Sequence, residues 1–169
     1  MACRMRIGLL LAWATAGSFG TAAAQDTRVT LSAGVSEFDL SGTGTAFTAS
    51  ARVDVPIRPV LLLEAGIGFL SADQQFGDTT TVLLPEVQAQ VQYPGSLSPY
   101  LGLGLGLAAD FRDEEDGGTE VDPTFSIAGG VRVAVTEELG LRAELRVRGH
   151  ETGFVGTTAD ITGGLSWRF

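Results

Sequence analysis

The sequence predicts an all-β protein, an eight-stranded antiparallel up-and-down transmembrane β-barrel. Apolar and polar residues alternate with a period of two through residues 29–169, which is the pattern of strands with one apolar face. The apolar stretches are roughly 8–11 residues long, the length that a tilted strand needs to cross a bilayer. No helical period competes with the alternation. The chain also contains 23 glycines, and glycine destabilises the interior of a helix.

Four segments carry the pattern in the first half of the chain. Residues 29–36 alternate Val, Leu and Ala with Thr, Ser and Gly, and residues 47–55 and 61–69 continue with charged residues among the polar positions. Residues 86–93 set Val, Ala and Tyr against Glu and Gln. Because Pro85 cannot donate a ladder hydrogen bond, we expect regular pairing of this fourth strand to begin at Glu86.

Four further segments follow in the second half. Residues 101–107 alternate Leu with Gly, and residues 125–135 set Phe, Ile and Val against Ser, Ala and Arg. Residues 141–148 alternate Leu, Ala and Val with Arg and Glu, and residues 158–169 place Ile, Leu, Trp and Phe on one face. An even number of strands is typical of an up-and-down barrel.

The predicted connections alternate between short and long. The short ones are residues 56–59, 94–98 and 136–140, and the long ones are residues 37–45, 71–80, 110–123 and 149–157. One end of the barrel should therefore carry the turns and both termini, and the other end four loops.

The N-terminal segment has the features of a secretory signal peptide. Arg4 and Arg6 precede an apolar run over residues 7–19, and three alanines stand before Gln25 as a small-residue cleavage site. An N-terminal anchor helix would need a longer apolar run. The predicted division is a cleaved signal peptide, residues 1–24, and a barrel domain, residues 25–169.

Composition excludes several classes of protein. The chain holds 11 arginines, no lysine and 20 acidic residues, for a net charge of −9, so it lacks the cationic surface that nucleic acid requires. Its mean hydropathy of +0.22 is unusual for a small soluble domain with 18% charged residues. The single cysteine, Cys3, lies in the predicted signal peptide, which excludes disulfides and thiolate metal sites in the mature chain.

The apolar face is expected to point outward to lipid rather than inward, as it would in a soluble lipocalin-like barrel. Gly102, Gly104 and Gly106 share the polar face with long charged residues, and inside a narrow barrel missing side chains make room for them. Aromatic residues on the apolar face stand at strand ends, as membrane-interface girdles do. These residues are Phe47, Phe69, Phe111 and Phe125 at the loop end, and Tyr93, Trp167 and Phe169 at the turn end.

The inward face collects charges of both signs. The predicted lumen charge network consists of Arg52, Asp54, Glu64, Glu86, Arg132, Arg142, Glu144, Arg146, Arg148, Asp160 and Arg168, with a sum of +1. Charges in a narrow interior must be paired, so a salt-bridged plug is the expected arrangement. The alternative is a narrow ion or solute pore in which the arginine–glutamate pairs rearrange.

The C-terminus resembles a known assembly signal. The last eight residues place Thr162, Gly164, Trp167 and Phe169 in the order polar, Gly, aromatic and terminal Phe, which resembles the β-signal of bacterial outer-membrane barrels. Residues 99–106 and 141–146 also resemble strands of the small eight-stranded superfamily of OmpA-like and OmpX-like barrels. The resemblance implies the bacterial outer membrane as location and periplasmic termini. It also implies contact with outer-membrane lipid and lipopolysaccharide, and with the barrel-assembly machinery during biogenesis.

The third loop is the most acidic. It offers Asp113, Glu114, Glu115 and Asp116 as candidate cation ligands, but their spacing does not match an EF-hand. A solvated loop is the expected interpretation, because runs of charge usually lie in solvent, and divalent-cation binding or a patch for a basic partner is the functional alternative. No cofactor is predicted.

An enzymatic alternative depends on His150, the one histidine, which lies in the fourth predicted loop. Some outer-membrane barrels modify lipid A with Ser and His near the outer leaflet. Here Ser166, the nearest serine in the sequence, belongs to the opposite end, so no nucleophile is evident. The sequence therefore predicts a monomeric, non-enzymatic envelope barrel of structural or surface-interaction type with acidic outer loops. The alternatives are a narrow pore and, second, a lipid A-modifying enzyme.

Overall fold

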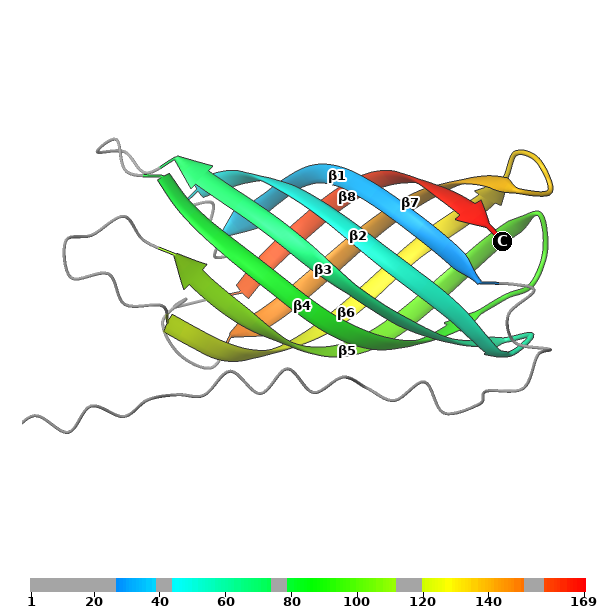
Figure 1. The fold of residues 1–169 in the computed structure, drawn as a ribbon, viewed down its shortest axis with the longest axis horizontal. Helices are drawn as coiled ribbons and strands as arrows, with labels where there is room; N and C mark the ends of the chain where they lie inside the picture. Colours follow the sequence, from blue (N-terminus) through cyan, green and yellow to red (C-terminus); the bar gives the residue numbers. More distant parts are fainter. Residues whose placement is uncertain (1–26, 39–43, 74–78, 112–119, 151–156) are drawn as a thin grey trace, which may run out of the picture.

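A computed structural model describes residues 27–38, 44–73, 79–111, 120–150 and 157–169, which form a closed barrel (Figure 1). Each strand pairs antiparallel with the next, and β1 pairs with β8 to close the ring. The strands are β1 Arg28–Phe38, β2 Gly44–Arg58, β3 Leu61–Asp73, β4 Thr79–Gln92, β5 Leu97–Phe111, β6 Glu120–Ala134, β7 Leu139–His150 and β8 Thr157–Arg168. The predicted eight-stranded antiparallel up-and-down barrel is confirmed. The described residues contain no helix that is long and apolar enough to cross a membrane.

The strands reach farther toward the loop end than predicted. β2 begins at Gly44, β5 runs to Phe111 and β6 begins at Glu120, so these strands take up residues that the sequence assigned to loops. The alternation continues there with fewer apolar residues, and backbone pairing does not need them. The remaining parts of the four predicted loops, residues 39–43, 74–78, 112–119 and 151–156, lie outside the described residues, as do residues 1–26.

The predicted start of the fourth strand is wrong. β4 begins at Thr79, and its pairing with β3 runs through Pro85, which lies opposite Ile67. On the other side, pairing with β5 is interrupted only at Leu84 and Pro85 and resumes at Leu83. The missing proline N–H thus weakens one edge of the ladder locally and does not end the strand.

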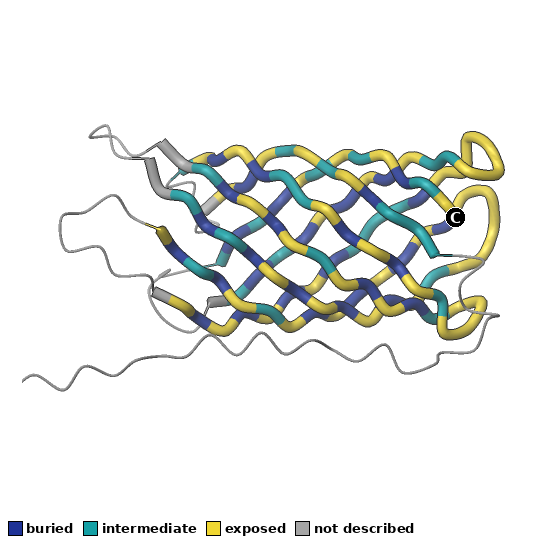
Figure 2. The backbone as a smooth tube through the Cα atoms, in the orientation of Figure 1, coloured by how far each residue is buried: buried dark blue, intermediate teal, exposed yellow. Residues whose placement is uncertain are grey.

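The two faces of the sheet are distributed as predicted (Figure 2). Along β5, Leu101, Leu103 and Leu105 are exposed on the outside, whereas Gly102 and Gly104 between them are buried. The predicted aromatic girdle residues are exposed on the same outward face, except for Trp167, which is half-buried. So large an exposed aliphatic surface requires an apolar medium around the barrel.

Glycines on the lumen side do make room for long side chains. A Cβ atom on Gly102 would overlap the amide group of Gln88. One on Gly104 would lie 2.5 Å from Glu86 Oε1 and from Ser126 Oγ. Any larger residue at these positions would displace a polar side chain of the neighbouring strand β4 or β6, which explains the Leu-Gly repeat of β5.

The lumen is not polar throughout. Near the loop end, buried apolar side chains gather on the inner face of β2 to β5, and we call them the apolar cluster: Ala46, Leu70, Val82, Leu84 and Ala108. The sequence analysis, which followed the charged residues, did not anticipate it. These residues occupy the same alternate positions as the charged ones, so period two already assigned them to the lumen.

We predict that an arginine on the outer face destabilises the barrel according to its depth. Leu103, at the centre of β5, and Leu97, at its turn end, are exposed to similar extents, 67% and 59%. Leu103→Arg should lower the free energy of unfolding by about 2–4 kcal/mol and Leu97→Arg by about 0–1 kcal/mol, because charge costs most at the bilayer midplane. Denaturant unfolding in lipid vesicles measures both. Equal losses would contradict a membrane-embedded centre.

Candidate functional site

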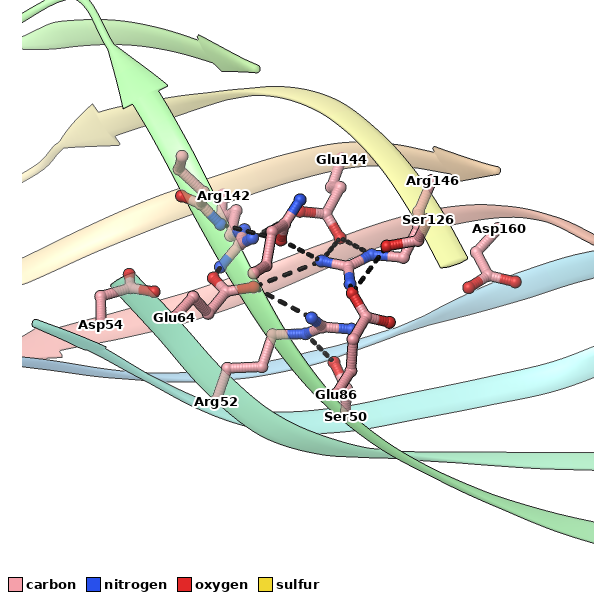
Figure 3. A network of polar contacts seen from close by, with 12 residues as sticks. Ser50, Arg52, Asp54, Glu64, Glu86, Ser126, Arg142, Glu144, Arg146 and Asp160 are labelled. Carbon is pink, nitrogen blue, oxygen red and sulfur yellow. Dashed lines mark hydrogen bonds and ion pairs between the residues drawn. The ribbon is translucent and has the colours of Figure 1, made fainter. Parts of the chain in front are cut away.

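The candidate site is a set of buried charged side chains that fills the lumen (Figure 3). Ten of the eleven charged residues assigned to the lumen are buried, and we call these ten the lumen network: Arg52, Asp54, Glu64, Glu86, Arg132, Arg142, Glu144, Arg146, Arg148 and Asp160. They stand at alternate positions of six strands, which directs each side chain inward. The eleventh, Arg168, is exposed at the turn end.

Several arginines converge on Glu64. Arg52 Nη1 lies 2.9 Å from Glu64 Oε1, and Arg146 Nη2 lies 3.2 Å from the same oxygen. Arg142 donates to Glu64 Oε2, and Arg132 Nη2 lies 3.6 Å from that oxygen. One carboxylate thus interacts with four guanidinium groups, each of which also has another acceptor nearby.

Some of these contacts cross the full diameter of the barrel. In a closed ring of eight strands, β3 lies opposite β7 and β2 lies opposite β6. Glu64 of β3 binds Arg142 and Arg146 of β7. Asp54 of β2 accepts a hydrogen bond from Arg132 Nη2 of β6 at 3.2 Å. The lumen is therefore bridged from wall to wall in two directions.

The network continues toward the loop end. Arg146 Nε donates to Glu144 Oε1 at 3.0 Å, and Arg146 Nη1 binds Glu86 of β4. Arg148 Nε donates to Glu86 Oε2 at 3.2 Å and its Nη1 binds Asp160 of β8. The alternating sequence of β7 therefore supplies one polar face that ties β3, β4 and β8 together.

The lumen network is neutral as a whole. It contains five arginines and five acidic residues, all buried. Isolated charges in such an interior would cost several kcal/mol each, whereas paired charges with additional hydrogen bonds are tolerated. The arrangement can hold the walls together and exclude ions, and it presents no exposed reactive group.

Tyr100 is the main participant that the sequence analysis missed. Its ring lies 4.2 Å from the Arg132 guanidinium carbon and 5.0 Å from that of Arg142. Its hydroxyl accepts a hydrogen bond from Arg142 Nε at 2.7 Å and donates to Glu144 Oε2 at 2.6 Å. Tyr100 stands two residues before Gly102, which occupies an inward position, so the alternation already indicated that the Tyr100 side chain points inward.

Neutral side chains complete the network. Gln90 Oε1 accepts a hydrogen bond from Arg132 Nη2 at 2.5 Å, and Gln88 Oε1 accepts one from Arg146 Nη2 at 2.8 Å. The Ser126 hydroxyl donates to Glu86 Oε1 at 2.8 Å. A search for charge alone overlooks such residues, although they share the inward positions.

Two acids assigned to the third loop belong to the lumen instead. Asp110 of β5 and Asp122 of β6 are buried on the inner face near the loop end. With Arg168 exposed, the buried charges of the described strands sum to −2 rather than the predicted +1. The cause is the strand extension described above, which carries the inward alternation past the predicted ends.

The other predicted site residues are placed only in part. In β8, Thr162 lies opposite Gly34 and Gly164 opposite Ser32, while Trp167 pairs with Val29. Their role as an assembly signal, with Phe169, stays a prediction. The candidate cation ligands Asp113, Glu114, Glu115 and Asp116 lie outside the described residues, and elsewhere no group of three or more His, Cys, Asp or Glu could hold a metal. His150 ends β7 instead of lying within a loop, and its side chain is outside the description.

Comparison with solved structures finds the same fold. Neisserial surface protein A superposes with a TM-score of 0.71 at 16% identity, over 85% of this chain and 96% of that chain. The N-terminal β-barrel domain of Pseudomonas aeruginosa OprF gives 0.60 at 16% identity, over 86% and 98%. Ail of Yersinia pestis, in complex with the heparin analogue sucrose octasulfate, gives 0.57 at 11% identity, over 85% and 99%.

No curated protein sequence matches the chain. A family comparison does, and it covers most of the sequence. Residues 9–169 match the family described as outer membrane protein beta-barrel domain, in agreement with the closed ring and the apolar outer face. The chain therefore belongs to the outer-membrane β-barrel family.

Proposed function

We propose that the protein is a closed outer-membrane barrel of structural or surface-interaction type without enzymatic activity. One observation carries the proposal: salt bridges span the lumen along two diameters, from Glu64 to Arg142 and Arg146 and from Asp54 to Arg132. Because their ends are fixed to opposite walls, an ion on the barrel axis would have to break them. In this proposal the lumen stabilises the barrel, and contact with other molecules takes place at the outer ends of the strands and at the loops.

A second barrier supports closure. The apolar cluster lies nearer the loop end than Glu64 and lines that part of the inner face of β2 to β5. A hydrated ion that entered from the loop end would meet this dry surface beside Asp110 and Asp122. Apolar side chains offer nothing to replace the hydration shell.

The family and the lengths of the connections support a proposal for the orientation of the barrel. We place the turn end and both termini in the periplasm, with the loops outside, among lipopolysaccharide. We further propose a monomer that does not bind nucleic acid and that meets the barrel-assembly machinery through its last strand.

The outer loops are proposed to meet a cationic or neutral partner. The sequence between β5 and β6, residues 112–119, holds four acids and one arginine. An acidic loop repels a polyanion such as the sucrose octasulfate held by Ail, so the likeness in fold does not extend to that ligand.

A narrow pore is the second candidate, and one observation favours it. Within the described residues, Asp54 Oδ1, Gln88 Nε2 and Arg132 Nε are buried without a hydrogen-bond partner. Buried polar atoms of this kind can exchange partners when side chains rearrange. Such exchange is the step that a conducting state would need.

Glu64→Gln should be strongly destabilising if the network holds the barrel closed. The substitution keeps the side-chain size but removes the charge shared by four arginines, leaving buried positive charge. We expect a loss of about 3–5 kcal/mol in the free energy of unfolding, measured in lipid vesicles.

Glu137→Gln is the matched control, since Glu137 is exposed in the turn between β6 and β7. Its effect should stay within about 0.5 kcal/mol. The double variant Glu64→Gln with Arg142→Gln should lose less than the sum of the single variants, because it removes a charge of each sign. Equal effects of Glu64→Gln and Glu137→Gln would show that the network does not stabilise the fold.

Conductance separates the two candidate functions. In planar bilayers the refolded protein should leave the baseline current unchanged, because the bridged lumen offers no continuous path. A heated and an unheated sample that migrate differently on a detergent gel establish that the barrel is folded. Steady, reproducible openings from the folded protein would reject the closed barrel in favour of the pore.

A further inference from the structure

Pro85 stands at an unusual place for a proline. It lies midway along the 14 residues of β4, a strand that is paired on both sides. The other prolines of the chain lie in turns or within four residues of a strand end. Such places are the usual ones, because proline cannot donate a ladder hydrogen bond. Regular pairing of β4 therefore does not account for a proline at its centre.

One hydrogen bond is missing beside Pro85. The pairing of β4 with β3 continues through Pro85, but its pairing with β5 lacks Leu84 and Pro85. The register with β5 is the same at Leu83 and at Glu86, so no residue is inserted between them. Both missing positions depend on one bond, from the N–H of residue 85 to the carbonyl of Leu107, and proline has no N–H. The Leu107 carbonyl thus lacks its ladder donor among the described strands.

The Leu107 carbonyl borders a groove on the outer wall of the barrel, which we call the outer groove. It has a volume of about 590 Å³ and runs across β1 to β5, of which β3 and β4 cross the near side of the barrel in Figure 1. Ala51, Ala65 and Pro85 contribute small exposed side chains to its lining, and Leu105 and Leu107 contribute large ones. The volume lies within the range of about 300–1,000 Å³ that is typical of ligand pockets.

No side chain in the lining of the outer groove is available to satisfy the carbonyl. Arg52 and Glu86 are the charged members of this lining, but both are buried and bind Glu64 and Arg146 in the lumen network. The other described lining residues are apolar or glycine. A backbone carbonyl without a donor is costly in contact with hydrocarbon. The groove therefore favours an occupant that is mainly apolar and brings one hydrogen-bond donor.

The depth of the carbonyl indicates which donor can reach it. Pro85 is two residues from Leu83, which lies opposite Phe69 of the loop-end aromatic girdle. Leu107 is four residues from Phe111 of the same girdle. At about 3.3 Å per residue along strands tilted by about 40°, the carbonyl lies roughly 5–10 Å below the girdle. The first carbons of an acyl chain lie at this depth, below the lipid head groups.

We propose that the outer groove binds a 3-hydroxyacyl chain of an outer-leaflet lipid, with the chain hydroxyl donating to the Leu107 carbonyl. Chains of this kind are the ones that lipid A carries, and a hydroxyl on the third carbon matches the depth of the carbonyl. The rest of the chain lies against the apolar lining of the groove. This inference rests on the proposed orientation, because loops outside the cell place the carbonyl in the outer leaflet.

Two esters that differ only in the hydroxyl test the proposal. Methyl 3-hydroxytetradecanoate and methyl tetradecanoate are titrated separately into the refolded protein in dodecylphosphocholine, a detergent without hydroxyl groups. The readout is the NMR cross-peak that joins the Leu107 carbonyl carbon to the Ala108 N–H. We expect a saturable downfield shift of this carbon with the hydroxylated ester only. The other ester should bind about tenfold more weakly, because it lacks the hydrogen bond.

Three variants separate the carbonyl from the groove. Pro85→Ala should abolish the preference for the hydroxyl and raise the denaturant midpoint, because the alanine N–H restores the ladder bond to Leu107. Pro99→Ala is the matched control and should keep the preference, since Pro99 is an exposed proline of β5 outside the groove. Ala65→Leu should weaken binding of both esters alike, because the larger side chain occupies the groove.

Several outcomes would overturn the proposal. They are equal affinity for the two esters, a carbonyl shift that does not saturate, and a preference that survives in Pro85→Ala. A carbonyl shift that grows with protein concentration in the absence of ester would also overturn it, by identifying a second copy of the chain as the occupant. Micelles have no leaflets and the titration measures no current. Failure of this site is therefore distinguishable from failure of the proposed orientation or of the closed lumen.

Discussion

The bridge from Glu64 of β3 to Arg142 and Arg146 of β7 is the interaction on which the rest of the barrel depends. It joins opposite walls, so closure of the ring and neutralisation of the lumen occur together. Each of these arginines also binds Glu144, and Arg146 also reaches Glu86 of β4. Because such charges are tolerable only as a paired set, loss of one member leaves its neighbours as uncompensated buried charge.

This central bridge explains sequence features at some distance from it. Gln88 needs the space that Gly102 leaves, and Glu86 needs the space above Gly104. The outer face of the same strand must meanwhile satisfy lipid, so β5 reads as alternating Leu and Gly. The sequence of β5 thus satisfies two constraints. Its inner face leaves space for long polar side chains of the neighbouring strands, and its outer face presents an unbroken aliphatic surface.

The sequence predicted the strands and the inward residues because both depend on a period of two, which is a local property. It did not predict which charges pair, because β2 and β6 meet only after eight strands close into a ring. The predicted strands ended too early, because the alternation of inward and outward residues continues beyond the last apolar residue. Asp110 and Asp122 were therefore counted as loop acids. Tyr100 was missed because a search restricted to charge passes over an aromatic ring, even one that contacts two arginines.

The two ends of the lumen differ in a way that the central bridge alone does not require. A neutral plug at mid-height already closes the barrel, yet the loop end adds the apolar cluster and the acids Asp110 and Asp122. The turn end, by contrast, leaves a hollow whose lining includes Arg28, Gln92 and Arg168. Closure needs neither feature, because it depends on the pairing of the eight strands and on the central bridge. The loop end therefore combines buried acids with apolar side chains, whereas the hollow at the turn end is lined by arginine, glutamine and serine.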